Sequence, residues 1–404
     1  MIPPKLNPTH PGYHHGNLSL TRTRKEQNSR AKATNDAILF DPTITSKVNL
    51  AECFRIFTDP TKISNEPAWW HQDPRTLARH PQLVVHTDGA CYNNGKMNAL
   101  SGSGIWYGPD DEKNRAIRVP GDSQSNQVGE LVAVIEAINA TPPFQPLEIL
   151  TDSKYVINGL TAHLGTWENR GWIGVKNAPH FRKAAHLLRI RTAPTTFKWV
   201  RGHNGNEGNE GSDLLAKEGA RKNEVDPINL DIPIEFDVQG ARLNALTQAI
   251  AYRGIKDSKK VPTRNMMRGN LQKACDAIYE YTGSLETDES IWHSIRKQEI
   301  QTKIRQFLFK TMHGTQKIGK FWAAIETYAH REHCRECGVT ETMEHILTRC
   351  REPPVRIIWS LTEQAWPSEF LEWPQISLGL ILGCGCITDR ENDRREFPNE
   401  NWPR

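Results

Sequence analysis

The stretch Leu83-Val84-Val85-His86-Thr87-Asp88-Gly89 is an apolar, β-branched run that ends in an acid and a glycine. Such a run is typical of a buried strand, and the glycine permits a close approach of backbone at its end. Two further β-rich runs follow at 104–107 and 116–119, and the turn-rich segment GPDDEKN separates them. The pattern predicts three sequential antiparallel strands.

Helices and strands alternate after these three strands. Apolar residues recur at helical spacing from 131 to 138 and predict a helix that Ser125 or Asn126 caps. The order of elements predicts an α/β fold, in which a mixed five-stranded sheet carries helices on its faces. The remaining predicted elements are strands at 147–150 and 196–200, a helix that opens at Asp152, and helices at 181–190 and 214–222.

The rest of the chain differs from this central domain, which we place at 81–223. Residues 1–80 are rich in Pro, Asn, Thr and Lys and show little periodicity, so we expect an extended, partly disordered arm. Apolar spacing predicts mostly helical structure after the domain. We expect a helical connector over 224–297, followed by a helical module with an irregular tail over 298–404.

Composition sets broad limits on the class of protein. The chain has 404 residues and a net charge of +4, which permits nucleic-acid binding without requiring it. No apolar run reaches the ~18 residues of a membrane-spanning helix, and the amino terminus lacks the pattern of a secretory signal. We therefore expect an intracellular protein, neither secreted nor in a membrane. Its eight cysteines are then reduced thiols or metal ligands.

Four acids stand where a strand is predicted to end or a helix to begin: Asp88, Glu130, Asp152 and Asp213. We expect them to meet at one edge of the sheet. Clustered carboxylates repel one another, so a fold that gathers four of them needs divalent cations, and oxygen ligands favour Mg²⁺ or Mn²⁺. Taken singly, Asp152 could cap its helix, Glu130 could interact with a helix dipole, and Asp213 could be a solvated acid.

Five motifs in chain order resemble those of type I ribonuclease H: TDGA, a glutamate after Asn126-Gln127, TDSKYV, WVRGH and NEGSDLLA. The resemblance covers roughly 83–220. It implies the ribonuclease H fold, two magnesium ions and hydrolysis of the RNA strand of RNA–DNA hybrids. Because two ions need a central bridging carboxylate, we assign that role to Asp88. Glu130 and Asp152 then bind one ion, and Asp213 completes the other.

One histidine belongs to the same predicted site. His203 lies in a loop that holds several glycines, and imidazole titrates near neutral pH. The resemblance implies that His203 supports catalysis by moving a proton or by helping products leave. The alternative is an exposed loop histidine without a function.

Other residues match family positions that hold the hybrid. Asn93, Asn126 and Gln127 match positions that contact the RNA strand, and amides suit a 2′-hydroxyl because they donate and accept. For Asn93, turn chemistry is an equal alternative. Arg170 and Trp172 resemble the family's basic handle, which grips the DNA strand. The alternative for Trp172 is packing in the core.

A second set of ligands lies near the carboxy terminus, where Cys334, Cys337, His345 and Cys350 follow the pattern C-x₂-C-x₇-H-x₄-C. Three thiolates and an imidazole suit a tetrahedral structural Zn²⁺ site; four buried side chains without a metal are the alternative. The segment resembles the zinc-binding domain beside reverse transcriptases in non-long-terminal-repeat retrotransposons. That resemblance implies a retroelement origin and makes a reverse transcriptase encoded elsewhere a candidate partner.

The sequence therefore predicts a metal-dependent endoribonuclease that acts on RNA–DNA hybrids. One alternative is a catalytically inactive nucleic-acid-binding protein of the same fold, and the intact set of acids argues against it. A second alternative is a DNA strand transferase of the same fold, and the glycine-rich loop argues against that one. The oligomeric state and the role of Cys384 and Cys386 are left open.

Overall fold

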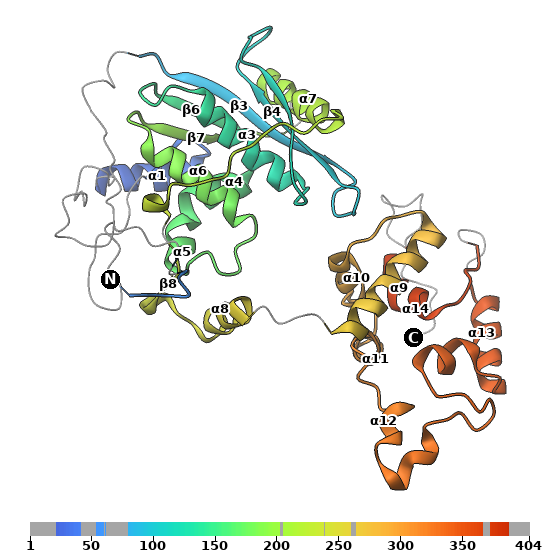
Figure 1. Ribbon diagram of the computed structural model, residues 1–404. Helices are drawn as coiled ribbons and strands as arrows, with labels where there is room; N and C mark the ends of the chain where they lie inside the picture. Colours follow the sequence, from blue (N-terminus) through green and yellow to red (C-terminus); the bar gives the residue numbers. More distant parts are fainter. Residues whose placement is uncertain are drawn as a thin grey trace. The chain divides into compact units, whose positions relative to one another are not determined.

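The computed structural model describes residues 22–41, 54–59, 61, 80–202, 205–237, 239–259, 264–366 and 372–387. Contacts divide the chain into two compact units (Figure 1). The first comprises Met1–Asn94 and Ala99–Val261, and the second comprises Gly95–Asn98 and Pro262–Arg404. The boundary that we predict between 297 and 298 thus lies inside the second unit, because helices on both sides of it share one apolar core.

A mixed six-stranded sheet with the order β1-β7-β6-β3-β4-β5 forms the centre of the first unit. The neighbours β3, β4 and β5 are antiparallel, as predicted, whereas β6 runs parallel to β3 and β7 runs parallel to β6. A separate ladder pairs β2 (Arg55–Ile56) with β8 (Ala241–Arg242). The strands of the large sheet are β1 (Ile38–Leu39), β3 (Leu83–Tyr92), β4 (Leu100–Trp106), β5 (Arg115–Arg118), β6 (Leu147–Thr151) and β7 (Thr195–Trp199).

The sixth strand comes from the segment that we predict to be an extended arm. Helix α1 (Arg22–Thr34) precedes β1, in which Ile38 pairs with Phe197 of β7 in antiparallel register. Phe40, directly after β1, is 4% exposed and belongs to the core. The prediction of five strands is therefore one strand short, because a two-residue strand has no alternating pattern to detect. Most other residues of the arm lie outside the described part of the chain.

Helices cover both faces of the sheet (Figure 1). Helix α3 packs on β3 and β4 and against α6, while α7 packs on β3, β4 and β5. Ser125 begins α3 as predicted, since its hydroxyl accepts a hydrogen bond from the Val128 N–H. The helices of this unit are α3 (Asn126–Ala140), α4 (Lys154–Asn158), α5 (Leu164–Asn169), α6 (Ala178–Ile190), α7 (Glu207–Arg221) and α8 (Gln248–Lys259).

Strand register places α3 and α7 on opposite faces. Asp88 pairs with Gly104, and Gly89 pairs with Ser103. Ser103 donates a 2.6 Å hydrogen bond to the backbone of α3, whereas a Cβ added to Gly104 would overlap the backbone of α7. Directly opposite residues of an antiparallel pair share a face, and successive residues alternate. The Asp88 side chain therefore leaves the sheet on the side of α7.

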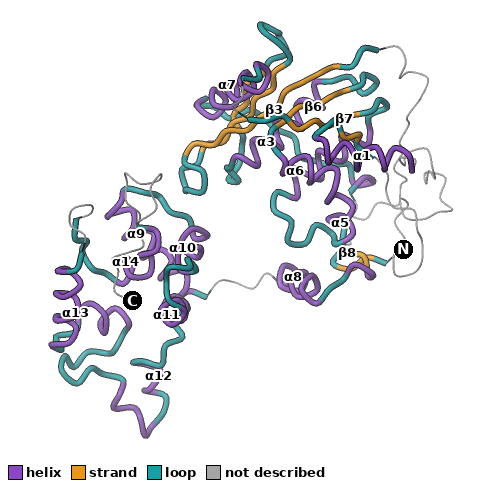
Figure 2. Tube along the Cα trace, turned by 180° about the vertical axis from the view of Figure 1, so that it is seen from behind, coloured by secondary structure: helices purple, strands orange, loops and turns teal. Residues whose placement is uncertain are grey.

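The second unit is helical (Figure 2). Its apolar core includes Leu271, Ile278, Ile291, Leu308 and Leu382. Within the described residues, no helix of either unit is both long enough and apolar enough to cross a bilayer. The helices of the second unit are α9 (Asn265–Thr282), α10 (Asp288–Ile295), α11 (Thr302–Met312), α12 (Lys320–Ala323), α13 (Pro353–Gln364) and α14 (Leu378–Gly383).

Candidate functional site

Three of the four predicted acids converge at one edge of the sheet. Carboxylate oxygens of Asp88, Glu130 and Asp152 all lie within 4.8 Å of one another. The last pair between the parallel strands β3 and β6 joins His86 to Leu150. Asp88 and Asp152 each stand two residues beyond that pair, where the two strands separate. Glu130 comes from helix α3. The cluster is therefore built from strand β3, from the residue after strand β6 and from helix α3.

The expectation that every acid marks a strand end or a helix start is wrong for two of them. Asp88 lies inside β3, which continues to Tyr92 because it stays paired with β4. Asp213 lies inside α7, which begins at Glu207 because Asn206 caps it through a 3.0 Å hydrogen bond. Gly208 and Gly211, which favour a loop in sequence, lie in the first turns of this helix.

Gly89 determines how closely α3 approaches β3. A Cβ added to Gly89 would overlap the backbone nitrogen of Glu130 and would lie 2.7 Å from the carbonyl oxygen of Asn126. The N–H of Gly89 also donates a 2.7 Å hydrogen bond to Oδ1 of Asp88. The missing side chain thus brings Glu130 to Asp88, and the backbone fixes the orientation of one Asp88 oxygen.

Gly89→Ala is expected to destabilise the first unit by about 1–3 kcal/mol, because the new methyl group forces α3 away from β3. It should also weaken binding of divalent cations, since Glu130 moves with the helix. Urea unfolding and calorimetric titration with Mg²⁺ measure the two effects. Gly108→Ala is the matched control, because its Cβ would meet no atom within 4 Å. Equal stability and equal affinity in the two variants would contradict this role of Gly89.

Burial and mutual repulsion raise the pKa values of the clustered acids. Asp88 is 7% exposed, and its burial, together with the charge of Asp152, raises the pKa of the Asp88 carboxyl to about 7. Burial, with the charges of Asp88 and Asp152, raises the pKa of Glu130 well above its usual range. The buried hydroxyl of Thr151 donates a 3.3 Å hydrogen bond to Oε2 of Glu130. Acids that hold protons near neutral pH exchange them for divalent cations, so this set of oxygen donors fits a hard cation.

The fourth acid, Asp213, lies beside this group of three. Its Oδ2 accepts a 2.6 Å hydrogen bond from Nζ of Lys217, one helical turn later. The charge of Asp213 also contributes to the raised pKa of Asp88, so the two carboxylates lie within electrostatic reach. Sequence reasoning misses both Lys217 and Thr151. The i,i+4 spacing of an acid and a lysine on one helix is the signal for the Lys217 pair.

The three residues predicted to contact the RNA strand all carry exposed amides. Asn126 and Gln127 open α3, one turn before Glu130, and both are exposed. Asn93 is exposed in the turn after β3 and has a φ of 51°, a conformation that asparagine adopts more readily than most residues. His203 lies outside the described residues, so its predicted role stays a prediction.

The predicted contacts to the DNA strand differ in their surroundings. Trp172 is 9% exposed and belongs to the core, where its ring centroid lies 6.2 Å from that of Trp167. The alternative that Trp172 packs in the core is therefore the one that the structure shows, and its ring does not present a face to a ligand. Arg170 follows α5 directly and is partly exposed. Of the two, only Arg170 is partly exposed, so it alone stays a candidate contact.

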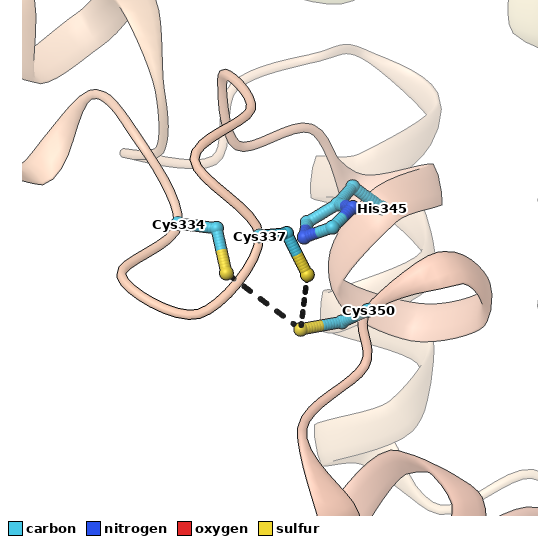
Figure 3. A group of neighbouring side chains, drawn as sticks. All are labelled: Cys334, Cys337, His345 and Cys350. Atoms are coloured by element: carbon cyan, nitrogen blue, oxygen red, sulfur yellow. Dashed lines mark hydrogen bonds between the residues drawn. The ribbon is translucent and has the colours of Figure 1, made fainter.

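The cysteine and histidine residues near the carboxy terminus also converge (Figure 3). Ligand atoms of Cys334, Cys337, His345 and Cys350 lie within 4.8 Å of one another. The sulfur of Cys350 is 3.7 Å from that of Cys334 and 4.0 Å from that of Cys337. Tetrahedral Zn²⁺ with bonds of about 2.3 Å separates its sulfur ligands by about 3.8 Å, so these spacings fit zinc.

The backbone around this cluster supports the same geometry. The N–H of Gly338 donates to the carbonyl of Cys334, and the positive φ of Gly338 (70°) turns the chain back after Cys337. The buried Nε2 of His345 has no hydrogen-bond partner in the described part of the chain. A buried imidazole nitrogen beside three sulfurs is a ready metal ligand.

Comparison with known proteins places the first unit in a family. The family model for RNase H matches residues 80–221. Ribonuclease H1 of Homo sapiens is 37% identical over 147 residues, which is 35% of this chain and 51% of that protein. Ribonuclease H of Polynucleobacter asymbioticus is 35% identical over 150 residues, which is 35% of this chain and 92% of that protein.

One solved structure, that of LC9-RNase H1, described as a type 1 RNase H with the type 2 active-site motif, is 23% identical with a TM-score of 0.30. The match covers 43% of this chain and 85% of that one. The chain spans about half the length of several curated relatives that it matches, including the human protein at 51%. The bacterial relative, in contrast, is covered nearly end to end. Because the family model matches and the bacterial relative is 35% identical over 92% of its length, the chain belongs to the ribonuclease H family.

Proposed function

We propose that this chain is a metal-dependent endoribonuclease that hydrolyses the RNA strand of RNA–DNA hybrids, with the catalytic domain at 81–223. The observation that carries the proposal is the group of carboxylates from Asp88, Glu130 and Asp152, whose oxygens lie within 4.8 Å where β3 and β6 separate. Membership of the ribonuclease H family supports the same reaction class.

Asp88, Glu130, Asp152 and Asp213 would hold two divalent cations, Mg²⁺ or Mn²⁺. When bound, such a pair of cations activates a water nucleophile and stabilises the leaving oxygen. The chain's own residues prepare the site. The Gly89 N–H orients the Asp88 carboxylate. Because Asp88 is buried in a poorly solvated site, the electrostatic interactions of its carboxylate are stronger than they would be in water.

The neighbouring polar groups select the substrate. Asn126, Gln127 and Asn93 carry exposed amides that can both donate to and accept from a 2′-hydroxyl, the group that distinguishes RNA from DNA. Arg170 is the candidate contact to a phosphate of the DNA strand. His203 would move a proton or help the products to leave.

The second unit has a structural role in this proposal. Cys334, Cys337, His345 and Cys350 would hold one Zn²⁺, which fixes the chain between α12 and α13. The resemblance of this segment to a retrotransposon zinc domain supports a retroelement-derived protein. A reverse transcriptase encoded elsewhere would then supply the hybrid.

A cleavage assay tests the proposal. The purified chain is mixed with a labelled RNA–DNA hybrid, double-stranded DNA or double-stranded RNA, with Mg²⁺ or in magnesium-free buffer that leaves zinc in place. We expect cleavage of the RNA strand of the hybrid alone, and only with Mg²⁺. Binding of the hybrid without cleavage would favour the inactive binding protein. Cutting and joining of DNA would favour the strand transferase.

A further inference from the structure

Helices α10 and α11 of the second unit, labelled in Figure 1, carry most of the residues that line two hollows outside the proposed nuclease site. Two adjacent hollows of about 550 Å³ and about 350 Å³ share Trp292, Arg296 and Phe309 as lining residues. His313 lines the larger hollow, while Arg305 and Lys310 line the smaller one. We call this surface the α10–α11 groove. Each hollow has the size of pockets that hold small organic groups.

Three aromatic rings line these hollows: Trp292 and Phe309 line both, and His313 lines the larger one. The ring centroids of Phe309 and His313 lie 4.4 Å apart, and those of Trp292 and Phe309 lie 5.9 Å apart. Trp292 packs against the apolar core of the unit, which holds the ring in place. Phe309 is 48% exposed. The rings therefore present an aromatic face that is anchored to the core at Trp292, and such a face suits a flat, unsaturated ligand.

The surroundings of the rings are basic. Residues 296–320 contain seven lysines and arginines and a single acid, Glu299, although the whole chain has a net charge of only +4. Arg296 and Lys310 are exposed at the groove. Among the residues that line the two hollows, the one acid is Glu289, whose carboxylate lies 3.7 Å from the imidazole of His293. The groove thus combines aromatic faces with an excess of positive charge.

We propose that the α10–α11 groove binds single-stranded nucleic acid. Bases stack on Phe309 and Trp292, and phosphates pair with Arg296, Arg305 and Lys310. Stacking on a protein ring needs a base that is not already stacked in a duplex, so the groove favours single strands over duplexes. An apolar protein helix would fill the hollows without needing this rim of cations. The proposal goes beyond the nuclease site, because it gives the helical unit a binding role of its own.

The test measures the affinity of the full-length chain for fluorescein-labelled single-stranded RNA and DNA of about 20 nucleotides, by anisotropy in magnesium-free buffer. Phe309→Ala is expected to weaken binding by about 5- to 150-fold, the range measured for loss of one stacked base. Arg296→Gln should lower the slope of log affinity against log salt by about 0.7, the value for one phosphate contact on a single strand.

Two control variants lie on the same unit, away from the groove. Tyr279→Ala removes another exposed ring, from α9, and Arg356→Gln removes another exposed charge, from α13. Both should bind single strands as the unaltered chain does. No binding of single strands, equal affinity in Phe309→Ala, or equal losses in the controls would each overturn the proposal. Because hydrolysis plays no part in this measurement, its outcome is independent of whether the chain cleaves hybrids.

Discussion

Asp88→Asn is expected to abolish the proposed hydrolysis of RNA–DNA hybrids, lowering the rate by about 10³-fold or more, because it removes the charge of the proposed central metal ligand. The fold should survive, since asparagine has the size of aspartate and can still accept the hydrogen bond from the Gly89 N–H. Single-turnover cleavage of a labelled hybrid measures the rate, and circular dichroism measures the fold.

The same variant should be more stable than the unaltered chain in metal-free buffer at pH 8. Burial raises the pKa of Asp88 to about 7, so between about pH 4 and about pH 7 the folded state binds more protons than the unfolded state. Stability therefore falls as the pH rises through that window, by at most about 4 kcal/mol for this group. Asparagine does not titrate, and urea unfolding at pH 5 and pH 8 should show a smaller fall for the variant.

Glu112→Gln is the control for these two effects, because it removes an exposed acid in the turn between β4 and β5. It should change neither the cleavage rate nor the dependence of stability on pH. Full activity in Asp88→Asn would show that another carboxylate bridges the cations. A fall in stability that is the same in Asp88→Asn as in the unaltered chain would place the raised pKa on a different group.

Cys337→Ser is expected to remove zinc from the chain and to loosen the segment around the site. We expect about one zinc per chain in the unaltered protein by elemental analysis and far less in the variant. The effect is large because zinc contributes about 10–16 kcal/mol of binding free energy in small zinc-binding peptides, and much of it stabilises the fold. Hydrogen exchange should accelerate from Cys334 to Cys350, where backbone hydrogen bonds close the loop.

Cys384→Ser serves as the matched control for the zinc site, since this exposed thiol is not part of the group of four ligands. It should retain the zinc and the slow exchange of the unaltered chain. Zinc content that is unchanged in Cys337→Ser would show that the four side chains are a metal-free cluster. Rapid exchange in both variants would point to a general effect of the lost thiol.

Much of the sheet can be predicted because its signals are local. The alternation of apolar runs and turn residues identifies β3, β4 and β5, and helical periodicity identifies α3. The two-residue strand β1 escapes detection, since its position depends on pairing with β7, a contact distant in sequence. The position of Asp213 within α7 is missed for a related reason: packing on β4 overrides the low helix propensity of the glycines before it.

The candidate site also has some features that the sequence predicts and others that depend on tertiary packing. The order of the motifs predicts that Asp88, Glu130 and Asp152 converge, and their carboxylate oxygens do lie within 4.8 Å of one another. The hydroxyl of Thr151 beside Glu130 depends on side-chain geometry that no spacing rule encodes. Trp172 is ambiguous in sequence, since a tryptophan beside an arginine serves equally to stack on a ligand or to fill a core, and only its surroundings decide.

Strand β1 covers part of one edge of the large sheet. By pairing with β7 it occupies amide and carbonyl groups that would otherwise face water along the rim of the sheet. Open rims of this kind recruit strands from neighbouring molecules. A fragment trimmed to the 80–221 region that matches the family model would lack this guard and the Phe40 ring beside it. A strand of two residues leaves little open rim of its own, so we expect this short segment upstream of the proposed site to limit pairing with other chains.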